Sequence, residues 1–269
     1  MVFFENKKTE HRSEYRNRYM KDNNHLQTVD KALMVLKYVA DAARPLGVTE
    51  ISEGLHFSKT ATFRFLETLE YNHYLYKHSD GRYEIGPQAM YISRRYRANE
   101  VVKDALFPIM RALRDRFNLG VQLCTLTDEE VIVVAYLHSH SVIQIKSEVG
   151  TLLPIHTAAA GKLILANMSE QRAEHYISRI QFIKTTGHSI CDADQFRKEI
   201  SEVRKKRYAI SQGEWNEHTF AIAVKAPYEG MEDFALVLVA AATIDHFEQG
   251  QKQLYEQIQE VINQYKVLS

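Results

Sequence analysis

Three short helix patterns followed by a hairpin signal constrain the fold of residues 28–86 more than any other feature of the chain. Apolar side chains recur at three- and four-residue spacing over 28–43, which predicts a first helix. Pro45 ends that pattern, and Thr49 can cap a second helix over 50–55. Three helices of this size can share one small core only if tight turns connect them.

The third helix and the hairpin have stronger local signals. Ser58 is a natural N-cap for a helix over 59–71. Asp80-Gly81 stands between two aromatic-rich runs, the arrangement typical of a two-stranded hairpin. We therefore expect residues 26–86 to form a winged helix-turn-helix domain, in which one helix enters the DNA major groove and the hairpin reaches the backbone or a neighbouring groove. A protein-docking module with a solvated polar face is the alternative, because winged helices also bind proteins.

Polar and basic side chains on the predicted outer surface suit contact with double-stranded DNA. An arginine can donate two hydrogen bonds to guanine, a threonine can bond a base edge or phosphate, and an aromatic ring can touch a thymine methyl group. The candidate DNA-binding residues are Thr49, Lys59, Thr60, Phe63, Arg64 and Arg82.

Composition places the chain among ordinary globular proteins. Its 269 residues are 45% hydrophobic and 25% charged, which excludes disordered and collagen-like classes. We expect a soluble cytoplasmic protein, since no apolar run approaches the roughly 20 residues of a membrane span. The two cysteines stand far apart, so we expect buried, reduced thiols and no zinc site.

Charge is unevenly distributed although the formal net charge is zero. Residues 1–98 carry 16 basic against 12 acidic side chains, and residues 99–269 carry 18 against 22. The basic half is thus the half that would meet a polyanion. We expect residues 1–25 to form a mobile basic arm, either following DNA or simply solvated. Residues 87–118 read as a helical linker and domain entry.

The remaining residues, 119–269, mix short strands with helices without regular alternation. Strands are predicted over 120–126, 131–137, 142–147, 221–226 and 234–242, and helices from about 158, after Ser169, from Asp192 and from about 245. This pattern indicates an α+β domain with an antiparallel sheet flanked by helices.

The segment 150–162 contains the principal candidate for a small-molecule site. It fails as a phosphate-binding P-loop because His156 and Leu163 stand where that motif needs Gly and Ser or Thr. Thr157 could instead cap a helix whose alanines let a ligand approach free N–H groups, or the alanines could merely allow close helix-sheet packing. His156 and His218 have no catalytic or metal-binding spacing, so we expect structural histidines, no enzyme activity, no cofactor and no metal.

In this order the motifs resemble the IclR family of bacterial transcriptional regulators. The resemblance extends from about Gln27 to Tyr265. It is carried by residues 28–33, 49–51, 58–69, 81–87, 149–162 and 208–214. It implies a winged-helix DNA-binding domain, a linker helix, and a GAF-like effector domain that takes a small organic acid or aromatic metabolite. It also implies homodimers that often pair into homotetramers.

By position, the resemblance places the effector site in the second half of the chain. The implied residues are Val142, Ile145, Leu153, Ala159, Ala160, Gly213 and Ala223. The chain departs from the family pattern where Ala223 replaces a common cysteine and Ala240–Ala242 replace serines, so the site has fewer hydroxyl donors. We therefore expect a larger or more apolar ligand than a two- or three-carbon keto acid. The overall expectation is a ligand-responsive, sequence-specific DNA-binding regulator, more often a repressor than an activator. An enzyme that uses the same pocket is the alternative.

Overall fold

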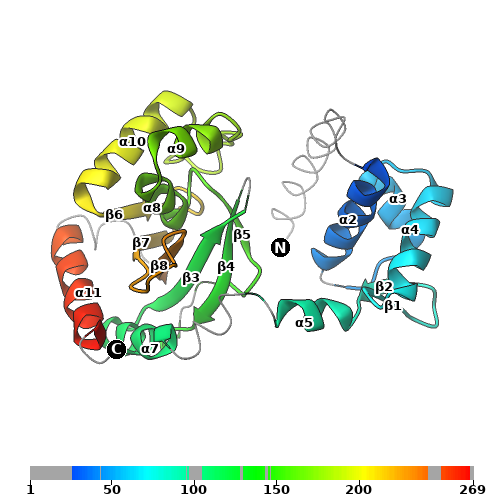
Figure 1. The fold of residues 1–269 in the computed structure, drawn as a ribbon, viewed down its shortest axis with the longest axis horizontal. Coiled ribbons are helices and arrows are strands. Elements are labelled where there is room, and N and C mark those ends of the chain that lie inside the picture. Colours follow the sequence, from blue (N-terminus) through cyan, green and yellow to red (C-terminus); the bar gives the residue numbers. More distant parts are fainter. Residues whose placement is uncertain are drawn as a thin grey trace. The chain divides into compact units, whose positions relative to one another are not determined.

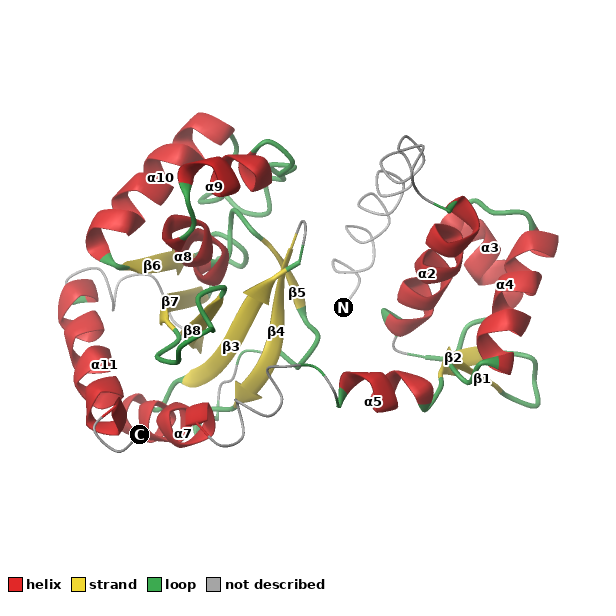
Figure 2. Cartoon of the chain, in the orientation of Figure 1, coloured by secondary structure: helices red, strands yellow, loops and turns green. Residues whose placement is uncertain are grey.

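The computed structural model describes residues 26–42, 44–94, 96, 105–127, 130–142, 145, 147–241 and 250–266. The predicted arm 1–25 therefore lies outside the described residues. The chain divides into two compact units, Met1–Tyr96 and Arg97–Ser269, with the division inside the predicted linker. Figure 1 labels their elements, and Figure 2 distinguishes helices from strands.

The first unit contains the predicted three helices and hairpin. Its elements are α2 (Gln27–Ala40), α3 (Val48–Leu55), α4 (Lys59–Tyr71), β1 (Leu75–Lys77), β2 (Tyr83–Ile85) and α5 (Gln88–Ser93). Their shared core consists of Val35, Val39, Leu46, Ile51, Leu55, Leu66, Leu75 and Tyr83. The predicted start of α4 is confirmed, because the backbone N–H of Ala61 donates to Ser58 Oγ at 3.2 Å.

The predicted cap of α3 was wrong. The helix begins one residue before Thr49, with Gly47 as its N-cap. Glu50 Oε2 accepts a hydrogen bond from the Gly47 backbone N–H at 2.8 Å. A carboxylate in the first turn thus replaces the expected threonine hydroxyl as partner of the orphan N–H group.

The second unit is built on a six-stranded antiparallel sheet in the order β5-β4-β3-β8-β7-β6. The strands are β3 (Gly120–Leu126), β4 (Glu130–Leu137), β5 (Leu152–Pro154), β6 (Tyr208–Gln212), β7 (Thr219–Lys225) and β8 (Phe234–Ala241). The helices are α7 (Phe107–Phe117), α8 (Ala159–Asn167), α9 (Glu170–Ile177), α10 (Ala193–Lys206) and α11 (Gln251–Lys266). The α+β class and the antiparallel sheet are confirmed.

Alternate residues of each central strand enter different cores. In β8, Leu236 and Leu238 pack with residues of α7 and α11, whereas Ala235 and Val237 pack with residues of α8 and α10. The helices therefore cover both faces of the sheet, α7 and α11 on one and α8 to α10 on the other (Figure 1). The small alanines on the α8 side let that helix lie close to the strands.

Several predicted boundaries differ from the structure. Of residues 142–147, those described are not in a strand, and the edge strand is instead β5. The strand β6 was not predicted from the sequence. Thr157 does not cap α8, because Ala158 is the N-cap and the Thr157 hydroxyl donates to the Pro154 carbonyl at 3.3 Å. Cys124 is buried as expected, but Cys191 is exposed.

Candidate DNA-reading surface and effector site

Helix α4 presents a polar and basic face to solvent. Its inward residues Thr62 and Leu66 are fully buried. The four candidate readers on this helix, Lys59, Thr60, Phe63 and Arg64, are all exposed. The Ser58 cap fixes where the helix starts, and the 3.6-residue period then sets which side chains point outward.

The hairpin carries the fifth candidate, Arg82. Gly81 has φ +80°, a conformation that suits glycine, and its N–H donates to the His78 carbonyl at 2.9 Å. The exposed Arg82 guanidinium lies 3.5 Å from Asp80 Oδ2 and 3.5 Å from the Pro45 carbonyl oxygen. Arg82 is thus close to the segment that leads into α3.

That segment brings in a residue that sequence reasoning missed. Arg44 Nη2 donates to Glu50 Oε1 at 2.6 Å, and this hydrogen bond holds the pKa of Glu50 below its usual value. Thr49, the sixth candidate, is exposed in the first turn of α3, and its carbonyl accepts a hydrogen bond from Ser52 Oγ. The only sequence signal for Arg44 was its basic side chain beside the helix-breaking Pro45.

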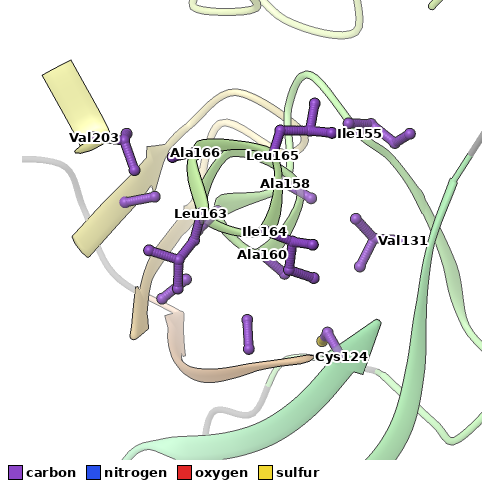
Figure 3. Close-up of a cluster of buried hydrophobic side chains, with 14 of the residues drawn as sticks. Cys124, Val131, Ile155, Ala158, Ala160, Leu163, Ile164, Leu165, Ala166 and Val203 are labelled. Atoms are coloured by element: carbon purple, nitrogen blue, oxygen red, sulfur yellow. The ribbon is translucent and has the colours of Figure 1, made fainter. Parts of the chain in front are cut away.

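In the second unit, four of the seven candidate effector residues belong to one apolar cluster around the start of α8. These are Leu153, Ala159, Ala160 and Ala223. Figure 3 shows part of this cluster, with Ala160 and Ile164 of α8 on the side of the helix nearer the strand that carries Cys124. These alanines are almost fully buried, and the first N–H groups of any helix have no partner within the helix.

The other three candidates lie elsewhere. Gly213, with φ +66°, follows β6 and is buried beside Glu214. Ile145 is half-buried, and its carbonyl accepts a hydrogen bond from the Tyr136 hydroxyl at 3.3 Å. The side chain of Val142 is fully exposed, so the described structure does not bring it to the α8 cluster.

A buried ion pair joins α8, just after its alanines, to Glu214. Lys162 Nζ donates to Glu214 Oε1 at 2.5 Å and to the Ile210 carbonyl at 2.9 Å. Burial raises the pKa of Glu214, and the nearby Lys162 opposes that rise. The pair joins residues 52 apart in sequence, and Lys162 has no sequence signal beyond its place in a segment that fails as a P-loop.

Side-chain hydroxyl groups of the 185–189 loop donate hydrogen bonds to the Gly213-Glu214 turn. The Glu214 carbonyl accepts hydrogen bonds from Thr185 Oγ1 at 2.6 Å and Ser189 Oγ at 2.8 Å. The Gly213 carbonyl accepts one from Thr186 Oγ1 at 2.6 Å. Three hydrogen bonds from side-chain hydroxyls to main-chain carbonyls therefore hold the turn next to the candidate site.

The two histidines that the sequence singled out lie in different surroundings. His156 is buried, with Nε2 3.1 Å from the Ile183 carbonyl and its ring against Phe182. His218 is exposed. Within the described ranges, no group of three or more His, Cys, Asp or Glu side chains could hold a metal ion. None of the helices in that part of the chain is long and apolar enough to cross a membrane.

Comparison with known families decides what these two units are. Residues 28–79 match the model of the IclR helix-turn-helix domain, and residues 95–264 match the model of the bacterial transcriptional regulator IclR C-terminal domain. The chain belongs to the IclR family. It is therefore a DNA-binding transcriptional regulator with a helix-turn-helix domain and a C-terminal effector domain, as the order of motifs indicated.

Relatives of known function have low sequence identity to this chain, but the matches cover most of its length. The transcriptional repressor IclR of Escherichia coli K12 is 21% identical over 80% of each chain. The HTH-type transcriptional repressor AllR of the same organism is 23% identical over 70% of each chain.

Solved structures support the same two-domain fold. The IclR transcriptional regulator from Alicyclobacillus acidocaldarius is 25% identical, with a TM-score of 0.73 over 90% of this chain and 98% of that one. An IclR homologue from Microbacterium hydrocarbonoxydans, complexed with 4-hydroxybenzoate, is 18% identical, with a TM-score of 0.72 over 90% of this chain and all of that one.

Proposed function

We propose that this IclR-family regulator is a repressor that binds an operator as a homodimer and changes its DNA affinity when a small organic acid or aromatic metabolite binds near α8. The exposed basic face of α4 beside the hairpin is the observation that carries the proposal. The names of the two repressors among its relatives support repression over activation. In this proposal the protein acts in the cytoplasm, because its operator DNA lies there, and it catalyses no reaction.

The DNA contacts divide into reading and positioning. Arg64 and Phe63 lie on the outward face of α4 and are the base readers, with Thr60 bonding a base edge or phosphate. Lys59 at the first turn of α4, Thr49 in α3 and Arg82 in the hairpin contact the backbone.

Apolar side chains that the first unit leaves exposed support the proposed self-association. Leu26, Val29 and Leu33 lie along the start of α2, and Met90, Tyr91 and Ile92 lie on α5, each at least half exposed. A second copy would bury such surface, and two copies place two α4 helices on two half-sites. Pairing of dimers into a tetramer is part of the same proposal.

The effector site that we propose includes Leu153, Ala159, Ala160, Gly213 and Ala223, with Ile145 joined to it through the Tyr136 hydroxyl. The exposed side chain of Val142 does not reach this site in the described structure. The described part of this set is almost wholly apolar, which favours an aromatic or aliphatic acid over a keto acid of two or three carbons. The carboxylate would accept hydrogen bonds from the first N–H groups of α8. The effector would then shift the population between two arrangements of the dimer that differ in half-site spacing.

DNA binding is tested by a salt-titrated mobility shift on the DNA upstream of the protein's own gene. Arg64→Ala is expected to remove about 1 to 3 kcal/mol of specific binding. Arg116→Ala is the control, because Arg116 is also an exposed arginine and lies on α7 of the second unit. Equal binding by wild type and Arg64→Ala would contradict the assignment of α4 as the reader.

Effector binding is tested by calorimetry with 4-hydroxybenzoate, pyruvate and glyoxylate as probes. The aromatic acid is expected to bind more tightly than either keto acid. Ala160→Val should weaken this binding, whereas Ala166→Val adds the same two methyl groups to another buried α8 alanine outside the proposed site. Keto acids that bind as tightly as the aromatic acid, or equal effects of the two valines, would contradict the proposal.

A further inference from the structure

A lysine of the hairpin is held directly against the DNA-reading helix. Lys77, the last residue of β1, donates from Nζ to Glu67 Oε1 of α4 at 2.9 Å. The same Nζ lies 5.6 Å from the ring centroid of Phe63 and 5.4 Å from that of Tyr83, within the range of cation–π attraction. One ammonium group therefore contacts both the helix and the second strand of the hairpin.

Tyr83 anchors this arrangement to the core. It is fully buried, and its hydroxyl donates to Glu67 Oε1 at 3.2 Å. Its backbone pairs with Lys77 across the hairpin and with Leu46 through two hydrogen bonds of 2.9 and 2.8 Å. Glu67 thus accepts hydrogen bonds from both strands of the hairpin, and the hairpin is joined to the segment before α3.

The position of Glu67 is unusual for a surface that meets a polyanion. It lies one turn after Phe63 on the same side of α4, and it follows Arg64 by three residues. An unpaired carboxylate there would repel phosphate, whereas the paired one is held by two donors. The hydrogen bond that Lys77 donates to Glu67 lowers the pKa of Glu67 and raises the pKa of Lys77, so both groups are charged at neutral pH.

We propose that Glu67 and Lys77 are positioning residues that fix the hairpin relative to α4, so that Arg82 and Arg64 contact one DNA site at a set separation. This inference rests on the proposed DNA-reading role of α4. Neither Glu67 nor Lys77 reads a base. Their contribution is to hold two contacting elements in one geometry before DNA binds, which lowers the entropic cost of binding.

A direct phosphate contact by Lys77 is the competing explanation, and Glu67→Gln separates the two. If Lys77 contacted phosphate and Glu67 merely competed for it, removal of the negative charge would tighten DNA binding. If the pair positions the hairpin, the loss of the ion pair weakens specific binding even though a negative charge near DNA has been removed.

The experiment uses the full-length protein and a duplex that the wild type selects from a random pool. Specific and non-specific dissociation constants are measured at several salt concentrations for Lys77→Met, Glu67→Gln, the double variant and Lys77→Arg. We expect Lys77→Met and Glu67→Gln each to weaken specific binding by about three- to tenfold, and the double variant to bind little more weakly than either. Lys77→Arg, which keeps the positive charge, should retain most of the wild-type affinity. Non-specific binding of Glu67→Gln should change less than its specific binding.

Matched controls come from a similar ion pair in the second unit. Lys205 Nζ lies 2.7 Å from Glu202 Oε1 on α10, and both side chains are at least as exposed as those of Lys77 and Glu67. Lys205→Met and Glu202→Gln should leave DNA binding unchanged. Thermal unfolding of every variant verifies that the first unit is folded.

The outcomes distinguish the positioning role of Glu67 and Lys77 from the DNA-reading role of α4. Tighter or unchanged specific binding by Glu67→Gln, with Arg64→Ala still defective, overturns the positioning role and leaves the reading helix in place. Additive effects of the two single changes also overturn it. Selection of no specific duplex by the wild type, or full binding by Arg64→Ala, overturns the assignment of α4 and the positioning role with it.

Discussion

The ammonium group of Lys162 and the carboxylate of Glu214 form a buried ion pair, with 2.5 Å between Nζ and Oε1. Lys162 also contacts the Ile210 carbonyl at 2.9 Å and Glu199 Oε1 at 3.5 Å, so its three N–H groups have three acceptors. The pair connects α8 to the turn after β6, and Glu199 adds a contact from α10. It therefore fixes the position of the α8 start relative to Gly213, the two sides of the proposed effector site.

Removing one member of this pair should destabilise the second unit. Lys162→Met retains most of the side-chain volume but leaves Glu214 as a buried, uncompensated charge, which costs about 3 to 5 kcal/mol. The double variant Lys162→Met/Glu214→Leu should recover part of that loss because neither charge is then left alone. Urea unfolding of the three proteins measures this, and a double variant less stable than Lys162→Met would contradict the explanation.

The raised pKa of Glu214 predicts that the free energy of unfolding depends on pH. Burial raises the pKa of Glu214 above 4.5, so above that pH the folded state holds a proton that the unfolded state has lost. Stability contributed by the protonated carboxyl is therefore present below about pH 4.5 and is lost as pH rises through the folded pKa. Glu214→Gln cannot titrate, so the difference in free energy of unfolding, wild type minus variant, should shrink as pH rises above 4.5. A difference that grows over this range would mean that the attraction of Lys162 outweighs burial.

Local signals predicted the elements that are fixed by neighbouring residues. Ser58, Ser169 and Asp192 each accept the backbone N–H three residues on, and each was expected from its own side chain. The Asp80-Gly81 turn likewise determines its hairpin locally. In these cases the physical cause lies within a few residues, where a sequence pattern can reveal it.

Features that depend on contacts distant in sequence could not be predicted in this way. The strand β6 has no strict alternation of apolar residues, and it pairs only along β7. Lys162 and Glu214 meet across 52 residues, and nothing beside either residue indicates the other. The same holds for Lys77 and Glu67, because the hairpin meets α4 through the core that Leu75 and Tyr83 share with Leu66.

Gly161 should tolerate no side chain. A Cβ there would lie 2.3 Å from the Ile155 carbonyl oxygen and 2.9 Å from Ile155 Cα, both backbone atoms. Gly161→Ala should therefore push α8 away from the preceding turn and lower the free energy of unfolding by about 1 to 3 kcal/mol. This loss exceeds the gain from the higher helix propensity of alanine. Gly187→Ala is the control, since a Cβ there meets nothing within 4 Å. Thermal unfolding compares the two, and equal melting temperatures would refute the close approach.

The two cysteines should differ sharply in reactivity. Cys124 is buried in the core beneath α8, and burial raises the pKa of its thiol to about 12. Because only the thiolate attacks an alkylating reagent, Cys124 should stay unmodified at pH 8, whereas the exposed Cys191 reacts. Mass spectrometry should find one adduct on the native chain and two after unfolding in guanidinium. Cys191→Ser should abolish native labelling, and an adduct on Cys124 of the folded variant would show that the α8 core opens to solvent.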